Sequence, residues 1–281
     1  MISIVIPAHN EAGVIARGLE MLTAGAEQDE IEIFVVCNGC SDHTAEVARL
    51  FAPVVRVIET DVPSKTNALN LGDATARSFP RIYVDADVVV RLDTIRALAE
   101  RLAAGDVHAV APTPIVDAGQ CSRLVRAYYA VRARLPSARQ GIGGSGVYAL
   151  SATGRARFTA FPDITADDAY VRLQFSPAER ATIPSVNSTV FAPRTLRSLL
   201  AIRARIYYGI AELARRFPEL PAKADASNNR ALVGLFKQPM MWPALTIYLL
   251  VNITARCMAS SRRGRTSVEW THDQSSRRQA A

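Results

Sequence analysis

Short apolar runs alternate with amphipathic segments through the first part of the chain, from Met1 to Val90. Runs rich in β-branched residues predict strands, and apolar residues spaced three and four apart predict helices. Strands are therefore expected at 2–6, 31–37, 54–58 and 81–84, and helices at 14–22, 45–51 and 65–77. This alternation predicts an α/β fold with a mostly parallel sheet and helices on both faces.

The rest of the chain is expected to be richer in helices. The same patterns predict helices at 94–103, 122–135, 169–175 and 194–217, and strands at 107–112 and 146–151. The glycine-rich segment Gln140–Ser145 is as consistent with a tight turn as with a ligand-binding loop. Pro218–Asn229 has the composition of a loop.

The formal net charge of +7 comes from the last third of the chain. From Pro193 onward there are 15 Lys and Arg against 5 Asp and Glu, whereas the residues before it hold 18 against 21. A basic region of this kind favours an anionic partner, either membrane lipid or a phosphorylated substrate. No nucleic-acid partner is expected, because the sequence holds no nucleic-acid-binding motif.

An apolar segment without a charged residue runs from Pro239 to Ala255. It is near the lower length limit for a spanning helix, and Trp242 and Arg256 would suit the two membrane boundaries. Two interpretations stay open: a helix that spans or lies on a membrane, and a buried helix of a soluble protein. Residues 259–281 are polar and rich in Arg and Ser, which predicts a disordered tail.

The first residues favour a cytoplasmic location for the catalytic part, at the inner face of the cell membrane if 239–255 contacts lipid. Met1–Pro7 has no basic n-region and is too short for a signal peptide, so it is expected to form the first strand. Four cysteines are too few for a disulfide scaffold. Cys37 and Cys40 flank an Asn-Gly turn, which favours two reduced thiols over a redox or zinc pair.

Two carboxylates, Asp85 and Asp87, follow the strand predicted at 81–84. Mg²⁺ and Mn²⁺ take oxygen ligands, and they commonly bind one or two carboxylates together with substrate phosphates. Ligands of parallel sheets bind beyond the carboxyl ends of the strands. The loops 7–11, 38–42 and 85–87 all follow such ends, so one cleft is expected to gather them.

Four segments together resemble family 2 glycosyltransferases, which have the GT-A fold and use nucleotide-diphosphate sugars. They are 2–11, 38–44, 65–72 and 85–87, in the order expected of that family. The resemblance implies a catalytic domain over 1–190, with a nucleotide-sugar half at about 1–112 and an acceptor half at about 113–190. A basic helical region would follow at 191–258, before the tail at 259–281.

The resemblance also implies which residues meet the donor. Contacts with the nucleotide, its phosphates or a Mn²⁺ or Mg²⁺ ion fall to Pro7, Ala8, Asn10, Glu11, Asn38, Asp42, Lys65, Asp85, Ala86 and Asp87. Asp87 would bind the metal, and Asp85 would hold the ribose or a metal-bound water. Family members often carry Asp-Asp-Gly-Ser where this chain has Cys37–Cys40. The resemblance implies a uridine base, but this loop lacks two carboxylates that family members offer to it.

The general base is assigned in the same way. Asp167 and Asp168 align loosely with a Thr-Glu-Asp segment of the family, and Asp168 would be the base. The alternative is a structural role, in which the two carboxylates are acidic residues at a helix N-terminus favoured by the helix dipole. Of the family's Gln-x-x-Arg-Trp motif only Arg205 remains, which favours transfer of a single sugar over polymer synthesis. Arg203 and Arg205 would contact the diphosphate or an acceptor phosphate, or form a solvated basic face.

The implied activity is an inverting hexosyl transfer from a nucleotide-diphosphate sugar, most often UDP-linked, to an acceptor hydroxyl. The sequence does not identify the acceptor. The basic C-terminal part and the apolar segment 239–255 favour a lipid-linked or membrane-proximal molecule. A sugar nucleotidyltransferase is a competing interpretation, although Pro7–Glu11 lacks the glycines and basic residue that it would need. A catalytically silent, membrane-attached binding protein is another, which the two carboxylate pairs disfavour.

Overall fold

The protein is described here by a computed structural model, which covers residues 1–220 and 228–261. Most of the loop predicted at 218–229, and residues 262–281 of the tail predicted at 259–281, lie outside these residues. The described residues fall into two compact units whose sequences interleave. Unit 1 comprises Met1–Ile115, Gly141–Asp163 and Gln174–Val190; unit 2 comprises Val116–Gln140, Ile164–Leu173 and the described part of Phe191–Ala281. The domain boundaries expected at residues 112, 190 and 258 stay predictions.

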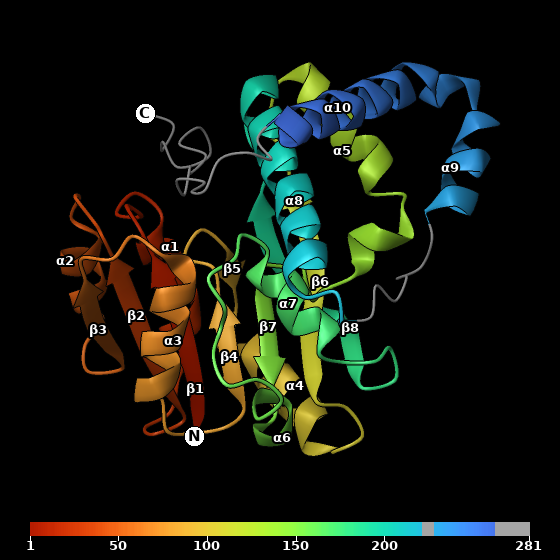
Figure 1. Ribbon diagram of the computed structural model, residues 1–281. Helices are drawn as coiled ribbons and strands as arrows, with labels where there is room; N and C mark the ends of the chain where they lie inside the picture. Colours follow the sequence, from red (N-terminus) through yellow and green to blue (C-terminus); the bar gives the residue numbers. More distant parts are fainter. Residues whose placement is uncertain (221–227, 262–281) are drawn as a thin grey trace. The chain divides into compact units, whose positions relative to one another are not determined.

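Unit 1 is an α/β unit built on one sheet, as predicted (Figure 1). Its strands are β1 (Ile2–Ala8), β2 (Ile31–Asn38), β3 (Val55–Thr60), β4 (Arg81–Val84), β5 (Val89–Val90), β6 (Ala109–Asp117), β7 (Val147–Leu150) and β8 (Arg180–Phe191). Its helices are α1 (Ile15–Thr23), α2 (Thr44–Arg49), α3 (Lys65–Thr75), α4 (Leu92–Ala103) and α6 (Ala152–Arg155). Among the described residues the strand order is β3-β2-β1-β4-β7-β6-β8-β5.

The register of the parallel strands brings three loops to one edge of the sheet. β1 pairs in parallel with β2 and with β4, so that Ala8 lies opposite Cys37 and Val5 lies opposite Tyr83. β7 runs antiparallel to β4 and closes this parallel part of the sheet. The carboxyl ends of β1, β2 and β4 therefore meet at the same edge, as the sequence predicts.

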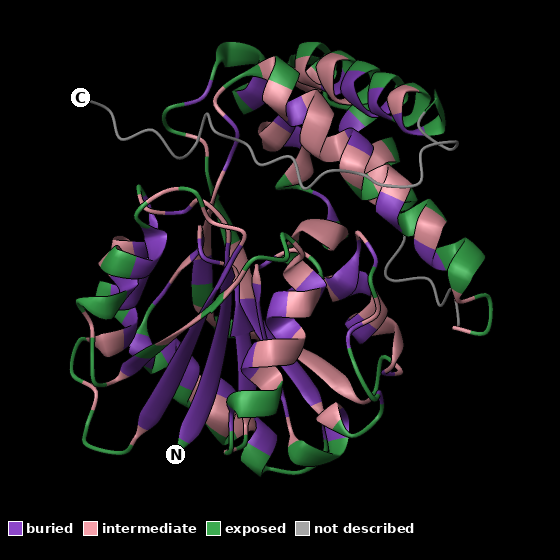
Figure 2. Cartoon of the chain, turned by 60° about the vertical axis from the view of Figure 1, so that its left-hand side comes forward, coloured by how far each residue is buried: buried purple, intermediate pink, exposed green. Residues whose placement is uncertain are grey.

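Both faces of the sheet are covered by helices. β1 and β2 are buried along their whole length (Figure 2), because alternate side chains pack on opposite faces. On one face Ile4 joins a cluster with Leu19 of α1 and Leu98 of α4. On the other face α3 packs closely through Gly72, where a Cβ atom would lie 2.5 Å from Cγ1 of Val5.

Several boundaries differ from the sequence-based expectations. β8 was not predicted, because Pro184 and alternating polar residues interrupt its apolar pattern, and it is only partly buried. α2 runs from Thr44 to Arg49, whereas the predicted helix is 45–51. α9 (Asn229–Phe236) begins inside the segment predicted as a loop. α10 (Trp242–Ser261) continues into the segment predicted as tail, so a disordered tail from residue 259 is wrong for 259–261.

Unit 2 is helical. It contains α5 (Arg123–Arg132), η1 (Pro136–Arg139), α7 (Asp167–Leu173), α8 (Leu196–Arg216), α9, η2 (Pro239–Met241) and α10. α10 packs along both α5 and α8. Val125 and Tyr128 of α5, Leu199 of α8 and Val251 of α10 form one apolar cluster. Leu235 of α9 joins a second cluster with α5 and α10.

A polar group lies inside this helical packing. Asn252 of α10 is 8% exposed, and its Oδ1 accepts hydrogen bonds from Tyr207 Oη at 2.7 Å and from Arg203 Nη2 at 3.2 Å. Its Nδ2 donates to the Tyr248 carbonyl at 2.7 Å. Because a buried amide is costly unless it is hydrogen-bonded, this group fixes how α10 is rotated against α8.

Candidate functional site

The loops that follow β1 and β2 in unit 1 are tied together by hydrogen bonds. Asn38 is fully buried at the end of β2, and its Nδ2 donates to the Ala8 carbonyl at 2.8 Å. Asp42 Oδ2 accepts from Ala12 N at 3.1 Å, and Asp42 Oδ1 accepts from Thr44 N at 3.1 Å. Asn38 and Asp42 therefore hold the two loops at this edge of the sheet through hydrogen bonds to backbone atoms.

Asn10 and Glu11 are placed by the same contacts. Asn10 has a positive φ of 54°, and its Oδ1 accepts from Ser41 N at 2.8 Å. Asparagine tolerates this left-handed conformation better than most residues. Glu11 is 4% exposed, and its backbone N donates to Thr44 Oγ1 at 2.8 Å. The structure thus holds the β1–α1 loop, which follows Pro7 and Ala8, directly against the β2–α2 loop.

Asp85 and Asp87 lie in a turn directly after β4, with Ala86 buried between them. Asp85 N donates to the Gly146 carbonyl at 2.8 Å, and the Asp85 carbonyl accepts from Val88 N at 3.1 Å. The Asp87 carbonyl accepts from Arg17 Nη2 of α1 at 3.2 Å. Arg17 was not singled out from the sequence, because nothing local marks a partner that lies 70 residues away.

Lys65 is the first residue of α3 and pairs with Asp85. Its Nζ lies 2.8 Å from Asp85 Oδ1, and the two side chains are 25% and 38% exposed. The structure therefore brings together a lysine and a carboxylate from two of the segments singled out in the sequence. A pair that is partly open to solvent can exchange partners when a phosphate or a metal ion binds beside it.

The donor set at this turn suits a hard divalent cation. No group of three or more His, Cys, Asp or Glu that could hold a metal occurs within residues 1–220 and 228–261. Mg²⁺ and Mn²⁺ do not need such a group, because they keep water and take substrate phosphate oxygens beside one or two carboxylates. Asp85 and Asp87 supply that number and kind of ligand, so the residues fit a metal shared with a diphosphate.

Gly146 of unit 1, the residue before β7, supports the turn at Asp85. It has φ +63°, and a Cβ atom there would lie 2.5 Å from Val88 Cγ2 and 3.3 Å from Asp85 Oδ2. Gly146→Ala is therefore expected to weaken Mn²⁺-dependent nucleotide binding about tenfold, because the turn must shift.

A matched control separates this effect from backbone strain. Gly105 has φ +79° but open space where its Cβ would lie. Gly105→Ala carries a similar left-handed strain of about 1–2 kcal/mol without touching the turn. Calorimetry should give wild-type nucleotide affinity for Gly105→Ala. Equal affinities for both variants would show that Gly146 does not position Asp85.

Cys37 and Cys40 are both free thiols, and neither is in a disulfide. A hydrogen bond between them lowers the pKa of Cys40 to about 6 and, together with burial, raises the pKa of Cys37. Cys40 Sγ also lies 3.5 Å from the Ala8 carbonyl. Cys37 thus lies in β2 and Cys40 in the β2–α2 loop, and the absence of a redox or zinc role for the pair stays a prediction.

The second pair of carboxylates, Asp167 and Asp168, lies in unit 2 at the start of α7. This helix begins at Asp167, two residues earlier than predicted. Asp167 is 5% exposed, whereas Asp168 is half-buried. Asp168 Oδ1 accepts from Ala169 N at 2.7 Å. Of the two carboxylates, Asp168 is thus the one that solvent can reach.

Two residues of α8 hold the start of α7 in place. Glu212 Oε2 accepts from Thr165 N at 2.9 Å. Gly209 lets the chain approach, since a Cβ atom there would lie 3.0 Å from Ala166 Cβ. Neither residue was identified from the sequence, because their role depends on a contact more than 40 residues away.

Arg203 and Arg205 lie on α8. Arg203 Nη2 donates to Tyr207 Oη and to Asn252 Oδ1, each at 3.2 Å, and its guanidinium lies over the Tyr207 ring. Arg203 is therefore used within the helix packing of unit 2. Arg205 is half-buried. Phosphate contacts by these two arginines stay a prediction.

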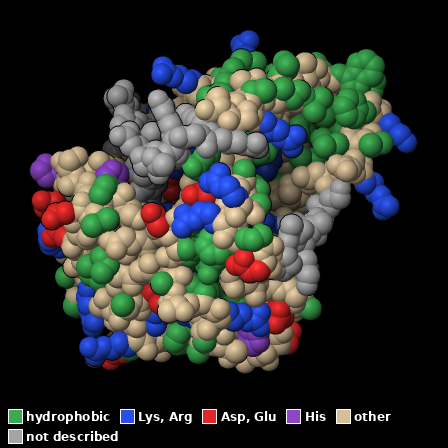
Figure 3. All heavy atoms as spheres, viewed as in Figure 1, with side chains coloured by type: hydrophobic (Ala, Val, Ile, Leu, Met, Phe, Trp, Pro, Cys, Tyr) green, Lys and Arg blue, Asp and Glu red, His purple; other side chains and the backbone are tan. Residues whose placement is uncertain are grey.

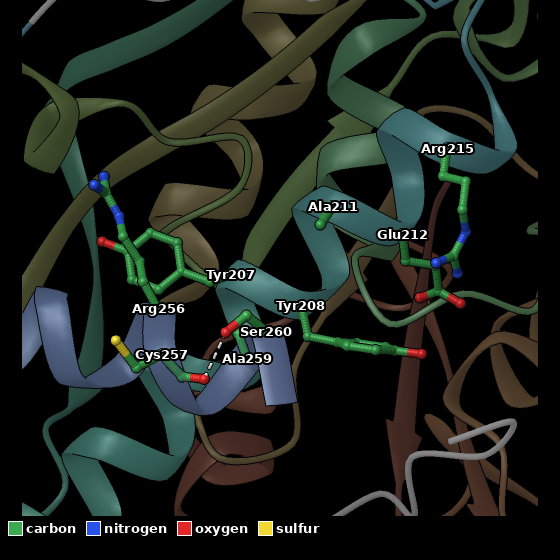
Figure 4. Close-up of a pocket in the computed structure, with 9 residues that line it drawn as sticks. All are labelled: Tyr207, Tyr208, Ala211, Glu212, Arg215, Arg256, Cys257, Ala259 and Ser260. Carbon is green, nitrogen blue, oxygen red and sulfur yellow. Dashed lines mark hydrogen bonds between the residues drawn. The ribbon is translucent and has the colours of Figure 1, made fainter. Parts of the chain in front are cut away.

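A pocket of about 760 Å³ lies between α8 and α10 within unit 2 (Figure 4). It is lined by Tyr207, Tyr208, Ala211, Glu212, Arg215, Arg256, Cys257, Ala259 and Ser260. The Arg256 guanidinium lies 5.0 Å from the centre of the Tyr207 ring. Two arginines and two tyrosines suit a ligand that carries an anionic group.

Comparisons with known proteins show the family of this chain. The sequence profile of glycosyl transferase family 2 matches residues 3–155, which is more than half of the chain. The chain therefore belongs to glycosyl transferase family 2. It is 31% identical over 116 residues to glycosyltransferase AglD of Haloferax volcanii and 33% identical over 94 residues to the probable glycosyltransferase YdaM of Bacillus subtilis.

These relatives are matched over only part of their length. The matches cover 38% and 31% of this chain, and 19% and 22% of the two relatives. The chain thus spans about a fifth of the length of the curated relatives it matches.

Solved structures show the fold. The mannosyltransferase PcManGT of Pyrobaculum calidifontis, in complex with GDP-Man and Mn²⁺, is 20% identical with a TM-score of 0.61, over 95% of this chain and 76% of that one. Glucosyl-3-phosphoglycerate synthase of Mycobacterium tuberculosis, in complex with Mn²⁺, UDP and phosphoglyceric acid, is 20% identical with a TM-score of 0.57, over 80% of both chains. The predicted GT-A fold is confirmed.

Proposed function

We propose that this protein is an inverting glycosyltransferase that moves one sugar from a nucleotide-diphosphate sugar to an acceptor hydroxyl. The observation that carries the proposal is the edge of unit 1 where the loops after β1, β2 and β4 meet, with Lys65 bonded to Asp85 in the turn that also holds Asp87. Membership of family 2 supports the same reaction class.

The donor side has to bind a diphosphate and stabilise it as it leaves. A Mn²⁺ or Mg²⁺ ion bound by Asp87 and Asp85 would supply positive charge to the phosphate oxygens. Lys65, which pairs with Asp85, would add a second positive charge beside them. Pro7, Asn10, Glu11, Asn38 and Asp42 would border the nucleoside. Uridine is the base that we expect, and related structures hold UDP or GDP-Man.

The acceptor hydroxyl needs a base, because its pKa lies far above neutral. Asp168 is the candidate, since it is the more exposed of the two carboxylates at the start of α7. Asp167 would lie beside it in the chain, and Glu212 would hold the start of α7 through Thr165. One base and one leaving group give in-line displacement with inversion at the anomeric carbon. The partial Gln-x-x-Arg-Trp motif supports transfer of a single sugar.

The donor assignment is tested by calorimetry with UDP, GDP and TDP, each with Mn²⁺ and with EDTA. One nucleotide is expected to bind tightly and only with metal, which would also name the donor base. A folded protein that binds none of them would instead favour the catalytically silent binding protein. Release of pyrophosphate from a nucleoside triphosphate and a sugar phosphate would favour the nucleotidyltransferase.

Asp168→Asn is expected to lower the turnover number at least a thousandfold, while nucleotide affinity changes less than twofold. The asparagine keeps the shape of the side chain but cannot accept a proton. Asp163→Asn is the control, because Asp163 is exposed and lies only five residues away. A small loss of turnover in Asp168→Asn would move the role of base to another carboxylate.

We also propose a cytoplasmic location for the catalytic part. For the acceptor, an anionic or membrane-proximal molecule is favoured, because Arg215 and Arg256 line the pocket of unit 2.

A further inference from the structure

Unit 2 exposes a group of large apolar side chains on α9, η2 and α10, here named the outer face. Seventeen large hydrophobic residues are exposed within the described part of the chain, and seven of them fall in a stretch of 21 residues. They are Val233, Phe236, Met240, Trp242, Leu249, Leu250 and Ile253. Figure 3 shows hydrophobic side chains gathered over α9 and α10. Such a gathering marks an interaction surface, because single exposed apolar residues are normally scattered.

The outer face follows the helical repeat of α10. Trp242, Leu249 and Ile253 are exposed and lie on one side of the helix, with Thr246 between them. An adjoining side carries the buried residues Leu245, Val251, Asn252, Ala255 and Ala259. One side of α10 thus packs in unit 2, and no described residue covers the side that carries Trp242, Leu249 and Ile253.

α10 is long enough to cross a membrane, since Pro239–Ser261 is the helical stretch that meets the length and hydropathy limits among the described residues. Its packing argues against that arrangement. Asn252 is hydrogen-bonded to Arg203 and Tyr207 of α8, and α8 also carries four more arginines and a glutamate. A spanning α10 would either lose these bonds or draw the charges of α8 into hydrocarbon, and both are costly.

The charges around the outer face have one sign. From Asn228 to Ser261 there is no Asp or Glu, and the cations are Arg230, Lys237 and Arg256, all exposed. Positive charge beside an apolar stripe complements the headgroups of anionic lipids and would repel a cationic partner. Trp242 stands near the start of the stripe, with its Nε1 bonded to the Phe236 carbonyl at 2.9 Å, and tryptophan favours the boundary between headgroups and acyl chains.

We propose that the outer face binds the surface of an anionic bilayer, with α10 lying in the plane of the membrane instead of crossing it. The apolar side chains enter the boundary between headgroups and acyl chains, and Arg230 and Lys237 contact lipid phosphates. The side of α10 that holds Asn252 stays packed on α8.

Vesicle flotation tests the binding. The full chain is expected to float with vesicles of phosphatidylcholine and phosphatidylglycerol, and to bind at least tenfold more weakly to phosphatidylcholine alone or in high salt. Leu250→Glu/Ile253→Glu is expected to weaken binding at least tenfold. The control is Leu50→Glu, because Leu50 is an 81%-exposed leucine at the end of α2 in unit 1. Equal binding by both variants, or self-association that needs no lipid, would overturn the proposal.

Depth measurements distinguish lying from spanning. Three single-tryptophan variants carry tryptophan at position 242, 249 or 257, with Trp270, and Trp242 where it is not the probe, replaced by phenylalanine. Quenching is measured with lipids brominated at different depths. A helix in the plane gives all three positions the same shallow depth. A spanning helix would separate positions 242 and 257 by about 22 Å along the membrane normal, at 1.5 Å per residue. That separation would overturn the proposal.

Discussion

Replacing Asp87 by asparagine is expected to lower the rate of glycosyl transfer at least a thousandfold, equivalent to about 4 kcal/mol of transition-state stabilisation. Asp87 lies in the turn after β4, beside Asp85, which is paired with Lys65. The leaving nucleotide gains negative charge in the transition state, and a neutral amide binds a divalent cation much more weakly than a carboxylate does. Nucleotide binding should also lose its dependence on Mn²⁺.

The experiment measures turnover and UDP or GDP affinity across a range of Mn²⁺ concentrations. Asp93→Asn serves as the control, because Asp93 is 68% exposed at the start of α4. Circular dichroism establishes that both variants are folded. Wild-type turnover in Asp87→Asn at ordinary Mn²⁺ concentrations would rule out a metal-binding role for this carboxylate.

The largest expected effect on stability comes from Asp73 of α3. Its side chain is 11% exposed and accepts from Tyr83 Oη at 2.6 Å. Arg81 Nη1 and Arg155 Nη2 lie 2.6 and 2.8 Å from its two oxygens. Asp73→Ala leaves two buried guanidinium groups without their carboxylate, so the free energy of unfolding should fall by about 3–5 kcal/mol.

Urea denaturation of the variant and the wild type checks this value. Asp106→Ala is the matched control, because Asp106 pairs with Arg101 at an exposed site and its loss should leave the unfolding midpoint unchanged. A similar small effect for Asp73→Ala would mean that the two arginines find other partners or water.

The same carboxylate gives an acid dependence. Burial alone would raise the pKa of Asp73, but hydrogen bonds from Tyr83 and Arg155 outweigh it and lower the pKa below its usual value. A pKa that is lower in the folded state adds stability above the unfolded pKa, and this stability is lost as the pH falls through the folded pKa. As the pH falls below about 4, the unfolded pKa of an aspartate, the wild type should therefore lose more stability than Asp73→Asn.

The sequence predicts those parts of the fold and site that depend on neighbouring residues. The apolar runs at 2–6 and 31–37 locate β1 and β2, and the position of Asp85 and Asp87 directly after β4 follows from the same local pattern. The alternation of strands and helices is enough to place their loops at one edge of the sheet.

The remaining features depend on contacts that are distant in sequence. Asp73 lies in the middle of a helix and shows no local sign that Arg155 will reach it from 82 residues away. β8 has a broken apolar pattern, and its place in the sheet is set by β5 and β6, strands distant from it in sequence. Glu212 and Arg17 likewise act through backbone atoms that only the folded chain brings near.

The hydrogen bonds of Asn252 to Arg203 and Tyr207 have a consequence for how α10 can evolve. They fix the rotation of the helix, and with it the direction in which Leu249 and Ile253 point. Inserting one residue between Trp242 and Asn252 would turn the preceding part of the helix by about 100° relative to this anchor. Natural variation in this helix should therefore consist of apolar exchanges at outward positions, with insertions and deletions confined to the segments before η2.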